Sequence, residues 1–405
     1  MAVPKLRFKA DDGSDYPEWN DFTKLEDISA FITKGATPTT YGFDWQPNGV
    51  YFFRNDCIKN NVFVYGDYSF IAEEANKFLQ RSEVTGGDIV IAITGDIGKV
   101  GLIPSEVKKA NINQHLARVR IVKDAFPYFV YMYLCSDKVQ RTYKKIKTGL
   151  SMPQLSLAQI RDTNIPVVSL PEQQKIAEFL STIDTVIEKQ KETVSAWEER
   201  KKGVMQKLFS QEVRFKADDG SDFPDWEEKK LGKVFTERTE RSKGGESLLS
   251  VTIAQGIVKQ SETDKRNIAS ENKSNYKIVK KNDLAYNTMR MWQGAEGVSE
   301  YDGIVSPAYT VITVLDGKNS YFFETMFKQT FMLQMFQRFS QGLTSDTWNL
   351  KFPAFSEIKC LIPCEDEQNK IVECVAVLDE VIEKQKATLA AWEELKKGLL
   401  QQMFM

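Results

Sequence analysis

The sequence predicts an α+β chain in which two mixed α/β domains are separated by two long helices, and in which a duplication relates the two halves by a pseudo-two-fold axis. Two repeats carry this prediction. Residues 7–15, RFKADDGSD, recur without change at 214–222. A longer stretch, 183–209, is identical to 378–404 at 17 of 27 positions. The segments between the repeats differ strongly, so we expect two nearly identical frames that hold two different domains.

The longer repeat predicts two helices that pair as an antiparallel coiled coil. No proline occurs from Glu172 to Phe209, and apolar residues recur there at the alternating spacing of a heptad seam. We expect the helices at 171–211 and 366–405, following domains at 1–170 and 212–365. The two seams are formed by Ile176, Leu180, Ile183, Ile187, Val194, Trp197, Val204 and Leu208, and by Ile371, Val375, Leu378, Ile382, Leu389, Trp392, Leu399 and Met403.

A glutamine lies at the middle of each seam, Gln190 in the first helix and Gln385 in the second. An antiparallel pair would bring the two glutamines together at the pseudo-dyad, where a polar residue can fix the register of a coiled coil. The alternative is that both are surface residues with no effect on register.

The duplication also makes a prediction about the two ends of the chain. Phe209 leads into Arg214 across a short segment, and the equivalent residues are Phe404 and Arg7. We therefore expect Arg7 to lie within about 17 Å of Phe404, the reach of five extended residues. The chain would then be nearly circular.

Each domain has the composition of a small sheet plus a helix. In the first domain, 69–74, 88–95 and 115–122 have the β-branched and alternating character of strands, and 127–146 is typical of an amphipathic helix. In the second domain, strand-like segments at 283–292 and 303–315 precede a helical segment at 320–339. We interpret the different sequences as recognition of two different targets.

Composition excludes several classes of protein. No apolar run is long enough to cross a bilayer, no secretory signal opens the sequence, and five cysteines cannot all pair, which together favour a reducing cytoplasm. The single histidine, His115, excludes His-based metal sites and is expected to be a polar or core residue. The segment TGDIGKVG at 94–101 lacks the spacing of a phosphate-binding loop. We find no catalytic constellation and no metal site.

The polar loops contain the residue types that contact nucleic acid. Arg, Lys, Asn and Gln can form paired hydrogen bonds with base edges, and cations and hydroxyls contact phosphates. The formal net charge of −2 means that such contacts must come from local patches. The candidate DNA-binding residues are Lys34, Thr37, Arg54, Asn55, Asn113, Gln114, Arg141, Lys144, Lys145, Lys147 and Ser151 in the first domain, and Arg238, Arg241, Lys243, Asn287, Arg290, Trp292, Gln293, Thr344 and Ser345 in the second.

The whole chain resembles the specificity subunit of type I restriction-modification enzymes. The resemblance rests on the helical segments PEQQKIAEFLSTIDTVIEKQK and EDEQNKIVECVAVLDEVIEKQK, on the turn KGATP at 34–38, and on YNTMRMWQGAEGV and YDGIVSPAYTVI within 286–312. In the second domain the KGATP turn is replaced by Arg241-Ser242-Lys243-Gly244-Gly245, so its first loop is expected to contact DNA differently.

The resemblance implies two target recognition domains that each read one half of a split site in double-stranded DNA. It implies that the helices act as a spacer and as a platform for two modification (methyltransferase) subunits. Restriction subunits, which carry translocation and cleavage, would join the full complex. This chain would then be non-catalytic and hold no cofactor, with S-adenosylmethionine, ATP and Mg on the partner subunits only.

Two other functions fit parts of the sequence. A coiled-coil adaptor with two protein-binding domains would show the same frame, and only sequence-selective DNA binding would exclude it. A self-sufficient nucleic-acid enzyme would require catalytic motifs that we do not find.

Overall fold

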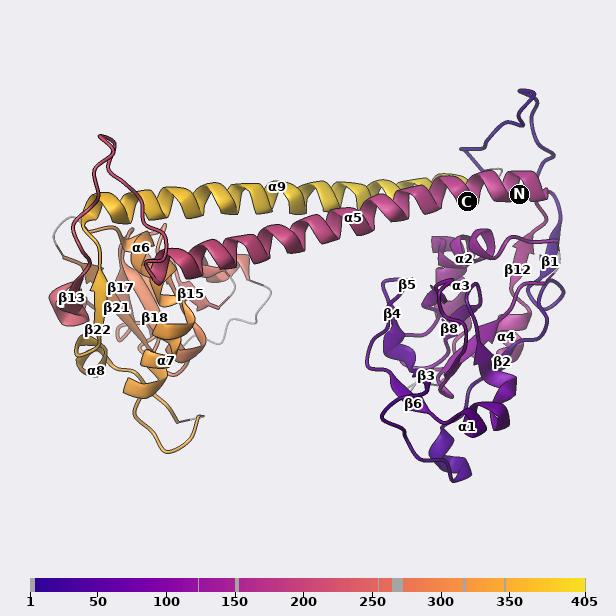
Figure 1. Ribbon diagram of the computed structural model, residues 1–405, viewed down its shortest axis with the longest axis horizontal. Coiled ribbons are helices and arrows are strands. Elements are labelled where there is room, and N and C mark those ends of the chain that lie inside the picture. Colours follow the sequence, from indigo (N-terminus) through magenta and orange to yellow (C-terminus); the bar gives the residue numbers. More distant parts are fainter. Residues whose placement is uncertain are drawn as a thin grey trace. The chain divides into compact units, whose positions relative to one another are not determined.

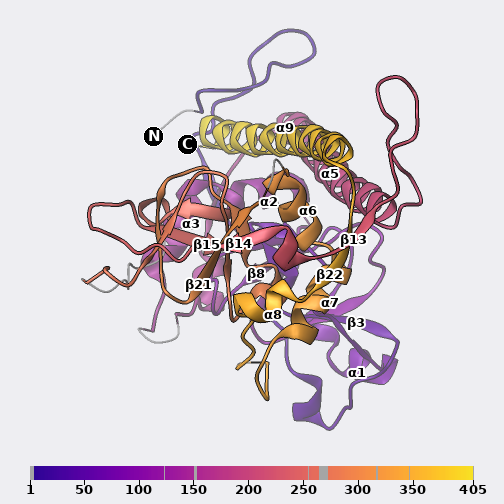
Figure 2. The ribbon, with the colours of Figure 1, turned by 90° about the vertical axis from the view of Figure 1, so that its left-hand side faces the viewer.

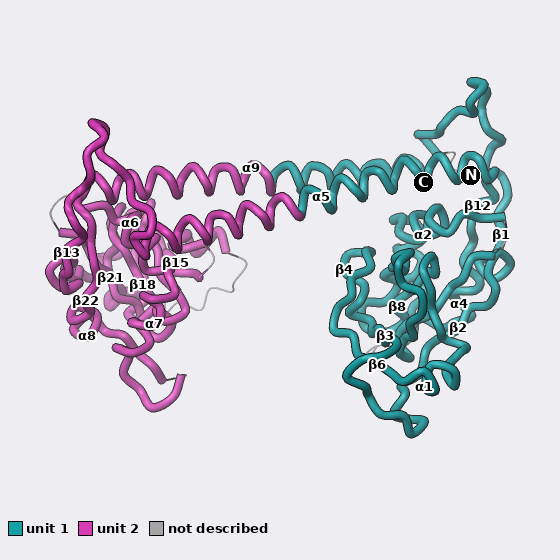
Figure 3. The backbone as a smooth tube through the Cα atoms, in the orientation of Figure 1, with its two compact units in different colours: residues 1–191, 387–405 teal, residues 192–386 magenta. Residues whose placement is uncertain are grey.

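The computed structural model describes residues 4–122, 124–149, 153–253, 255–263, 272–315, 318–345 and 347–404. The chain divides into two compact units, shown in different colours in Figure 3. Unit 1 comprises Met1–Lys191 and Ala387–Met405, and unit 2 comprises Glu192–Lys386. Each unit therefore contains one mixed α/β domain and a part of both long helices. Within the described ranges, no helix combines the length and apolarity that a membrane span requires.

The domain of unit 1 contains two four-stranded sheets (Figure 1). The first sheet has the strand order β2-β11-β8-β9 and is antiparallel throughout. The second has the order β6-β3-β10-β7, in which β10 runs parallel to β3. The bounds are β1 Phe22–Lys24, β2 Thr33–Lys34, β3 Val50–Phe53, β4 Ile58–Lys59, β5 Val62–Phe63, β6 Ser69–Ile71, α1 Glu73–Phe78, β7 Glu83–Val84, β8 Ile89–Ala92, β9 Val100–Leu102, β10 Ala110–Ile112, β11 Leu116–Val119, α2 Pro127–Cys135, α3 Asp137–Ile146, α4 Leu157–Arg161 and β12 Asn164–Pro166.

The domain of unit 2 repeats the first sheet of unit 1, with the antiparallel order β14-β21-β18-β19. Figure 2 labels two of these strands, β14 and β21. Its remaining core strands form the two-stranded ribbons β15-β16 and β17-β20. The bounds are β13 Glu227–Lys230, β14 Phe235–Glu237, β15 Leu249–Thr252, β16 Gly256–Lys259, β17 Lys277–Val279, β18 Leu284–Asn287, β19 Glu296–Val298, β20 Gly303–Val305, β21 Tyr309–Val314, α6 Ser320–Phe327, α7 Thr330–Phe339, α8 Phe352–Ser356 and β22 Lys359–Ile362.

The helix predicted at 127–146 is two helices, and so is the helix predicted at 320–339. Ser136 has extended backbone angles between α2 and α3, and Gln329 has them between α6 and α7. In unit 1 the reason is visible in the burial pattern. The residues of α2 from Phe129 to Leu134 are all buried, whereas α3 has a broad exposed face. A bend allows the first helix to enter the core and the second to lie on the surface.

The two long helices have nearly the predicted bounds, α5 Leu170–Phe209 and α9 Glu365–Met403. Their buried and half-buried positions follow the predicted heptad seams. Within unit 2, Lys201 of α5 pairs with Asp379 of α9 over 2.5 Å, and Lys386 pairs with Glu198 over 3.0 Å. The residue number rises from 198 to 201 on α5 while the number of the paired residue falls from 386 to 379 on α9, so these segments are antiparallel.

Unit 1 shows the same pairing. The core of unit 1 contains four seam residues of α5, Ile176, Leu180, Ile183 and Ile187, together with Met403 at the end of α9. Three seam residues of α9 pack against this core: Leu389, Trp392 and Leu399. Gln190 belongs to unit 1 and Gln385 to unit 2, so the meeting of the two glutamines stays a prediction.

The short repeat anchors the start of each long helix. In unit 1 the guanidinium of Arg7 donates to both carboxylate oxygens of Glu172, over 3.0 and 2.9 Å, and the indole of Trp19 donates to the same carboxylate over 3.1 Å. In unit 2 the same contacts join Arg214 and Trp226 to Glu367, at distances from 2.7 to 3.1 Å. We call each of these three-residue groups a carboxylate clamp.

The prediction about the ends of the chain is confirmed. The amides of Lys5 and Leu6 donate to the carbonyl of Gln402 over 2.8 and 3.2 Å. The ring of Phe404 lies 6.2 Å from that of Trp19, and in unit 2 Phe209 lies 6.2 Å from Trp226. Both described ends of the chain therefore meet within unit 1.

Candidate nucleic-acid interface

Backbone hydrogen bonds gather three loops at one end of the first sheet of unit 1. The amide of Ile93, which follows β8, donates to the carbonyl of His115 over 2.9 Å. The amide of Leu155 donates to the carbonyl of Ile93 over 2.9 Å. Thr148 and Gln154 exchange two backbone hydrogen bonds that close the loop after α3. We call this end of the sheet the loop end of unit 1.

Unit 2 builds a loop end with the same bonds. The amide of Thr288, which follows β18, donates to the carbonyl of Ala308 over 3.4 Å. The amide of Leu350 donates to the carbonyl of Thr288 over 2.8 Å, and Gln341 and Asn349 exchange backbone hydrogen bonds. The backbone frame is therefore shared although the side chains are different.

At the loop end of unit 1 the structure brings together several candidate residues in a chain of hydrogen bonds. The hydroxyl of Thr37 donates to Oε1 of Gln114 over 2.5 Å. Nε2 of Gln114 lies 3.1 Å from Nε2 of His115, and Nδ1 of His115 lies 2.6 Å from the hydroxyl of Thr94. Asn113 is buried, and its Oδ1 accepts the amide of His115, so it supports the turn from inside.

Arg54 and Asn55 follow β3 near the same loops. The guanidinium of Arg54 donates to the hydroxyl of Ser69 over 2.8 Å and lies 5.3 Å from the ring centre of Trp45. Nδ2 of Asn55 lies 3.7 Å from where a Cβ on Gly95 would stand, which places Asn55 beside the loop that carries Thr94. The structure thus adds one cation and one amide to this region.

The basic cluster of the first domain is split between two places. Arg141 and Lys145, on the exposed face of α3, line a pocket with Phe404 at the end of α9. Arg141 also lies 3.5 Å from Asp137. Of the remaining candidates, Lys34, Lys144 and Lys147 are exposed, and Ser151 lies outside the described residues.

The loop end of unit 2 carries an aromatic pair. The rings of Trp292 and Trp348 are in edge contact, with centres 5.1 Å apart. The indole of Trp292 donates to the carbonyl of Met289, whose amide donates to Oδ1 of Asn287. Four further candidates on these loops are exposed: Arg290, Gln293, Thr344 and Ser345.

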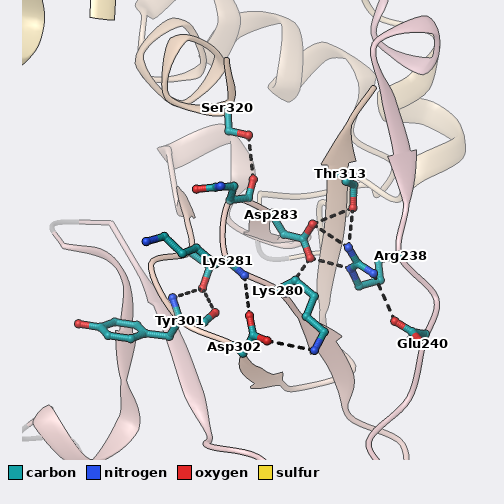
Figure 4. Close-up of polar contacts among 11 residues, drawn as sticks. Arg238, Glu240, Lys280, Lys281, Asp283, Tyr301, Asp302, Thr313 and Ser320 are labelled. Carbon is teal, nitrogen blue, oxygen red and sulfur yellow. Dashed lines mark hydrogen bonds and ion pairs between the residues drawn. The ribbon is translucent and has the colours of Figure 1, made fainter. Parts of the chain in front are cut away.

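Arg238 has a different environment from the other candidates (Figure 4). Its guanidinium donates to both carboxylate oxygens of the buried Asp283, over 2.6 and 3.1 Å, and lies 3.2 Å from Glu240. The Asp283 carboxylate also accepts the hydroxyl of Thr313 and the amide of Lys280. These contacts, and first among them the bond to Asp283, raise the pKa of Arg238. Arg238 anchors the start of β18, and its contact with nucleic acid stays a prediction.

Arg241 and Lys243 lie on a separate loop of unit 2. The guanidinium of Arg241 donates to the carbonyl of Asn275 over 2.8 Å. The carboxylate of Glu246 accepts the hydroxyl of Ser242 and the amide of Lys243, and these bonds lower the pKa of Glu246 to about 2. These contacts hold Arg241 and Lys243 within their own loop, so the unit 2 candidates form two groups.

Residues 17–195 of this chain match a family model described as the type I restriction modification DNA specificity domain. This chain is 27% identical over 175 residues to the MjaVIII specificity subunit of Methanocaldococcus jannaschii. The matched region covers 42% of this chain and 41% of the relative. This chain is also 28% identical over 191 residues to the MjaIX specificity subunit of the same organism, covering 46% and 43%. The matches span about half the length of these curated relatives or less.

Solved structures share the fold of this chain. The S subunit of a type I restriction-modification system from M. genitalium superposes with a TM-score of 0.56 and 16% identity, covering 100% of this chain and 99% of that one. A chain from a study of complex assembly in a type I system superposes with a TM-score of 0.55 and 15% identity, covering 95% and 97%.

Sequence reasoning missed two groups of residues in this chain. Thr94 was not a candidate, although it ends the polar chain of unit 1. Glu172 and Glu367 were not recognised as the acceptors of the carboxylate clamps. The signal was present for the clamps, because each begins at the Arg of the unchanged repeat RFKADDGSD.

Proposed function

We propose that this chain is the DNA-recognition subunit of a type I restriction-modification complex and that each unit reads one half of a split target. One observation carries the proposal. The two loop ends have the same backbone hydrogen bonds but present different side chains, a polar chain at Gln114 and an aromatic pair at Trp292. A shared scaffold with exchanged contact residues is what reading two different half-sites requires, because base contacts specify sequence.

Partners and cofactors follow from the family. We infer that the long helices bind two methyltransferase subunits and that restriction subunits join the full complex in the cytoplasm. The chain itself would be non-catalytic. S-adenosylmethionine, ATP and Mg would then be bound by the partner subunits, and this chain would contribute only the choice of target.

Mapping of methylated bases in cells tests this proposal. Cells that carry the chain together with the modification subunit of its own system should show one bipartite motif, with two specified parts and a fixed gap. Cells that carry either protein alone should show none. Absence of any sequence preference with both proteins present would contradict the proposal and favour the adaptor function.

Matched variants assign the two halves of the motif to the two units. Trp348→Ala removes half of the aromatic pair and should relax the bases of one half-site only. Gln255→Glu changes an exposed side chain in the turn between β15 and β16 of the same unit and should leave the motif unchanged. Loss of both half-sites in the Trp348 variant would show that the units do not read DNA separately.

A further inference from the structure

The polar chain at the loop end of unit 1 has a definite direction of hydrogen bonding. Nε2 of Gln114 carries only hydrogens, so it donates to Nε2 of His115. Nε2 of His115 is then the acceptor, and its Nδ1 lies 2.6 Å from the hydroxyl of Thr94. At the other end, the hydroxyl of Thr37 donates to Oε1 of Gln114. His115 and Thr37 therefore hold the amide of Gln114 from both sides.

Among the described residues, each polar atom of this amide has one hydrogen-bond partner. Nε2 has two hydrogens and gives one to His115, and Oε1 has two lone pairs and uses one for Thr37, so each has a second position for a further partner. Gln114 is half-buried. One N–H beside one lone pair is the pattern that pairs with N7 and N6–H of adenine in the major groove. Guanine presents two acceptors there, so it would meet the lone pair of Oε1 with repulsion.

The backbone brings the members of the chain together at close range. Gly35 lies directly against β10, since a Cβ there would stand 1.8 Å from the carbonyl oxygen of Ile112. Only glycine allows this approach, which sets Thr37 beside Gln114. Thr94 is held by the bonds that fix Ile93, its neighbour in the chain. In unit 2 the residue in the place of His115 is Ala308, so that unit has no equivalent of this arrangement.

We propose that Gln114 reads an adenine in the half-site of unit 1, and that His115 is the positioning residue that sets the direction of the Gln114 amide. This inference rests on the proposed function. His115 touches no base in it and acts only through Gln114. A reversed amide would require a proton on Nε2 of His115, so the tautomer of His115 and the orientation of Gln114 are tied together.

The first test replaces Gln114 with its isosteric acid in the full complex. The complex of this chain with its modification subunits selects sites from DNA in which every target position is randomised, and the base preference is measured at each position. Gln114→Glu removes the N–H and should lower the preference for adenine at one position of one half-site by roughly 5- to 150-fold. Gln255→Glu, with the same change of charge in the exposed turn between β15 and β16, should leave every preference unchanged.

The second test separates positioning from structure with two replacements of His115. Gln at 115 can place an acceptor where Nε2 of the imidazole stood, and Asn can reach only the position of Nδ1. We expect His115→Gln to keep the adenine preference within about threefold and His115→Asn to lose it as Gln114→Glu does. Both variants should unfold at the same temperature. Equal preferences in the two variants would overturn the role of His115.

The outcomes distinguish this inference from the proposed function. If the wild-type complex selects no bipartite site, the proposed function fails. If it selects one and Gln114→Glu leaves all base preferences intact, only the assignment of Gln114 fails. If the altered position prefers a base other than adenine in the wild type, the assignment of adenine fails.

Discussion

A buried aspartate directly before the hairpin β8-β9 in unit 1 and before the hairpin β18-β19 in unit 2 is anchored differently in the two units. Asp88 precedes β8 and Asp283 precedes β18, and each accepts a backbone amide from the preceding turn over 2.8 Å. Asp88 binds Arg120, which follows β11, whereas Asp283 binds Arg238, which follows β14. Both units place a cation beside this carboxylate, but β11 is adjacent to β8, whereas β14 is separated from β18 by β21.

The carboxylate clamps show the opposite behaviour. Arg7 and Trp19 bind Glu172 with the same atoms with which Arg214 and Trp226 bind Glu367. Here both the contact and the sequence repeat. The comparison indicates that the frame is constrained residue by residue, while the domains are constrained only in the contacts that hold the backbone.

Breaking a clamp should have the largest effect on stability. The carboxylate of Glu172 is fully buried, so Glu172→Ala leaves an arginine and an indole without their acceptor. We expect a loss of about 3 kcal/mol in the free energy of unfolding. Glu172→Gln keeps an acceptor for the indole and should lose less. Hydrogen exchange measured by unit should show the loss in unit 1, and Glu367→Ala should show it in unit 2. Equal losses of stability in both units after Glu172→Ala would contradict the expectation that each carboxylate clamp stabilises its own unit.

Moving the arginine between strands tests whether the anchoring of Asp283 is interchangeable. Arg238→Thr leaves the buried carboxylate without its guanidinium and should lower the free energy of unfolding by about 2–3 kcal/mol. Adding Thr313→Arg places a guanidinium on the strand that supplies Arg120 in unit 1 and should recover at least half of the loss. Urea titration of both variants measures this. A double variant no more stable than the single one would show that the strand of origin matters.

Glu296 offers a smaller and pH-dependent contrast. Glu296 lies fully buried on β19, and its carboxylate oxygens accept no hydrogen bond within the described part of the chain. In unit 1 the equivalent position on β9, judged from the strand pairing, is occupied by the apolar Val100. Burial raises the pKa of Glu296 well above its ordinary value. The folded state therefore binds this proton more tightly than the unfolded state, and stability falls as the pH rises above about 4.5.

Glu296→Gln should remove this pH dependence. We expect the variant to be more stable than the wild type by about 1–2 kcal/mol at pH 8 and equal to it near pH 4. Nearby Glu324 and Lys328 are unchanged and serve as an internal control. Thermal unfolding across this range of pH measures the difference, and a gap that widens toward low pH would refute the assignment.

The smallest expected effect concerns the middle of the coiled coil. Replacing both Gln190 and Gln385 with Leu should stabilise the helices by less than about 1 kcal/mol while broadening their register. Distances between spin labels on α5 and α9 would show a wider distribution in the double variant. An unchanged distribution would mean that the glutamines do not fix the register.

The two long helices and the position of the clamps were predictable because the sequence patterns that specify them are local and occur twice. Heptad spacing set the seams of α5 and α9, and the unchanged RFKADDGSD marked the clamps even though their acceptors went unnoticed. The polar chain of unit 1 was only partly predictable. Gln114 and Thr37 are 77 residues apart, and only the close approach at Gly35 brings them together. The ion pair of Arg238 was not predictable for the same reason, because its partner Asp283 is 45 residues away.

The hydrogen bonds from Lys5 and Leu6 to Gln402 have a practical use as a sensor. A donor and an acceptor dye attached at residues 5 and 402 would lie within a short radius of each other while the end of α9 is docked. Energy transfer between them would fall as soon as that end detached from the core of unit 1, to which Met403 and Phe404 belong. Such a pair would report the docking of the last helical turns in real time, with the rest of the molecule left unlabelled.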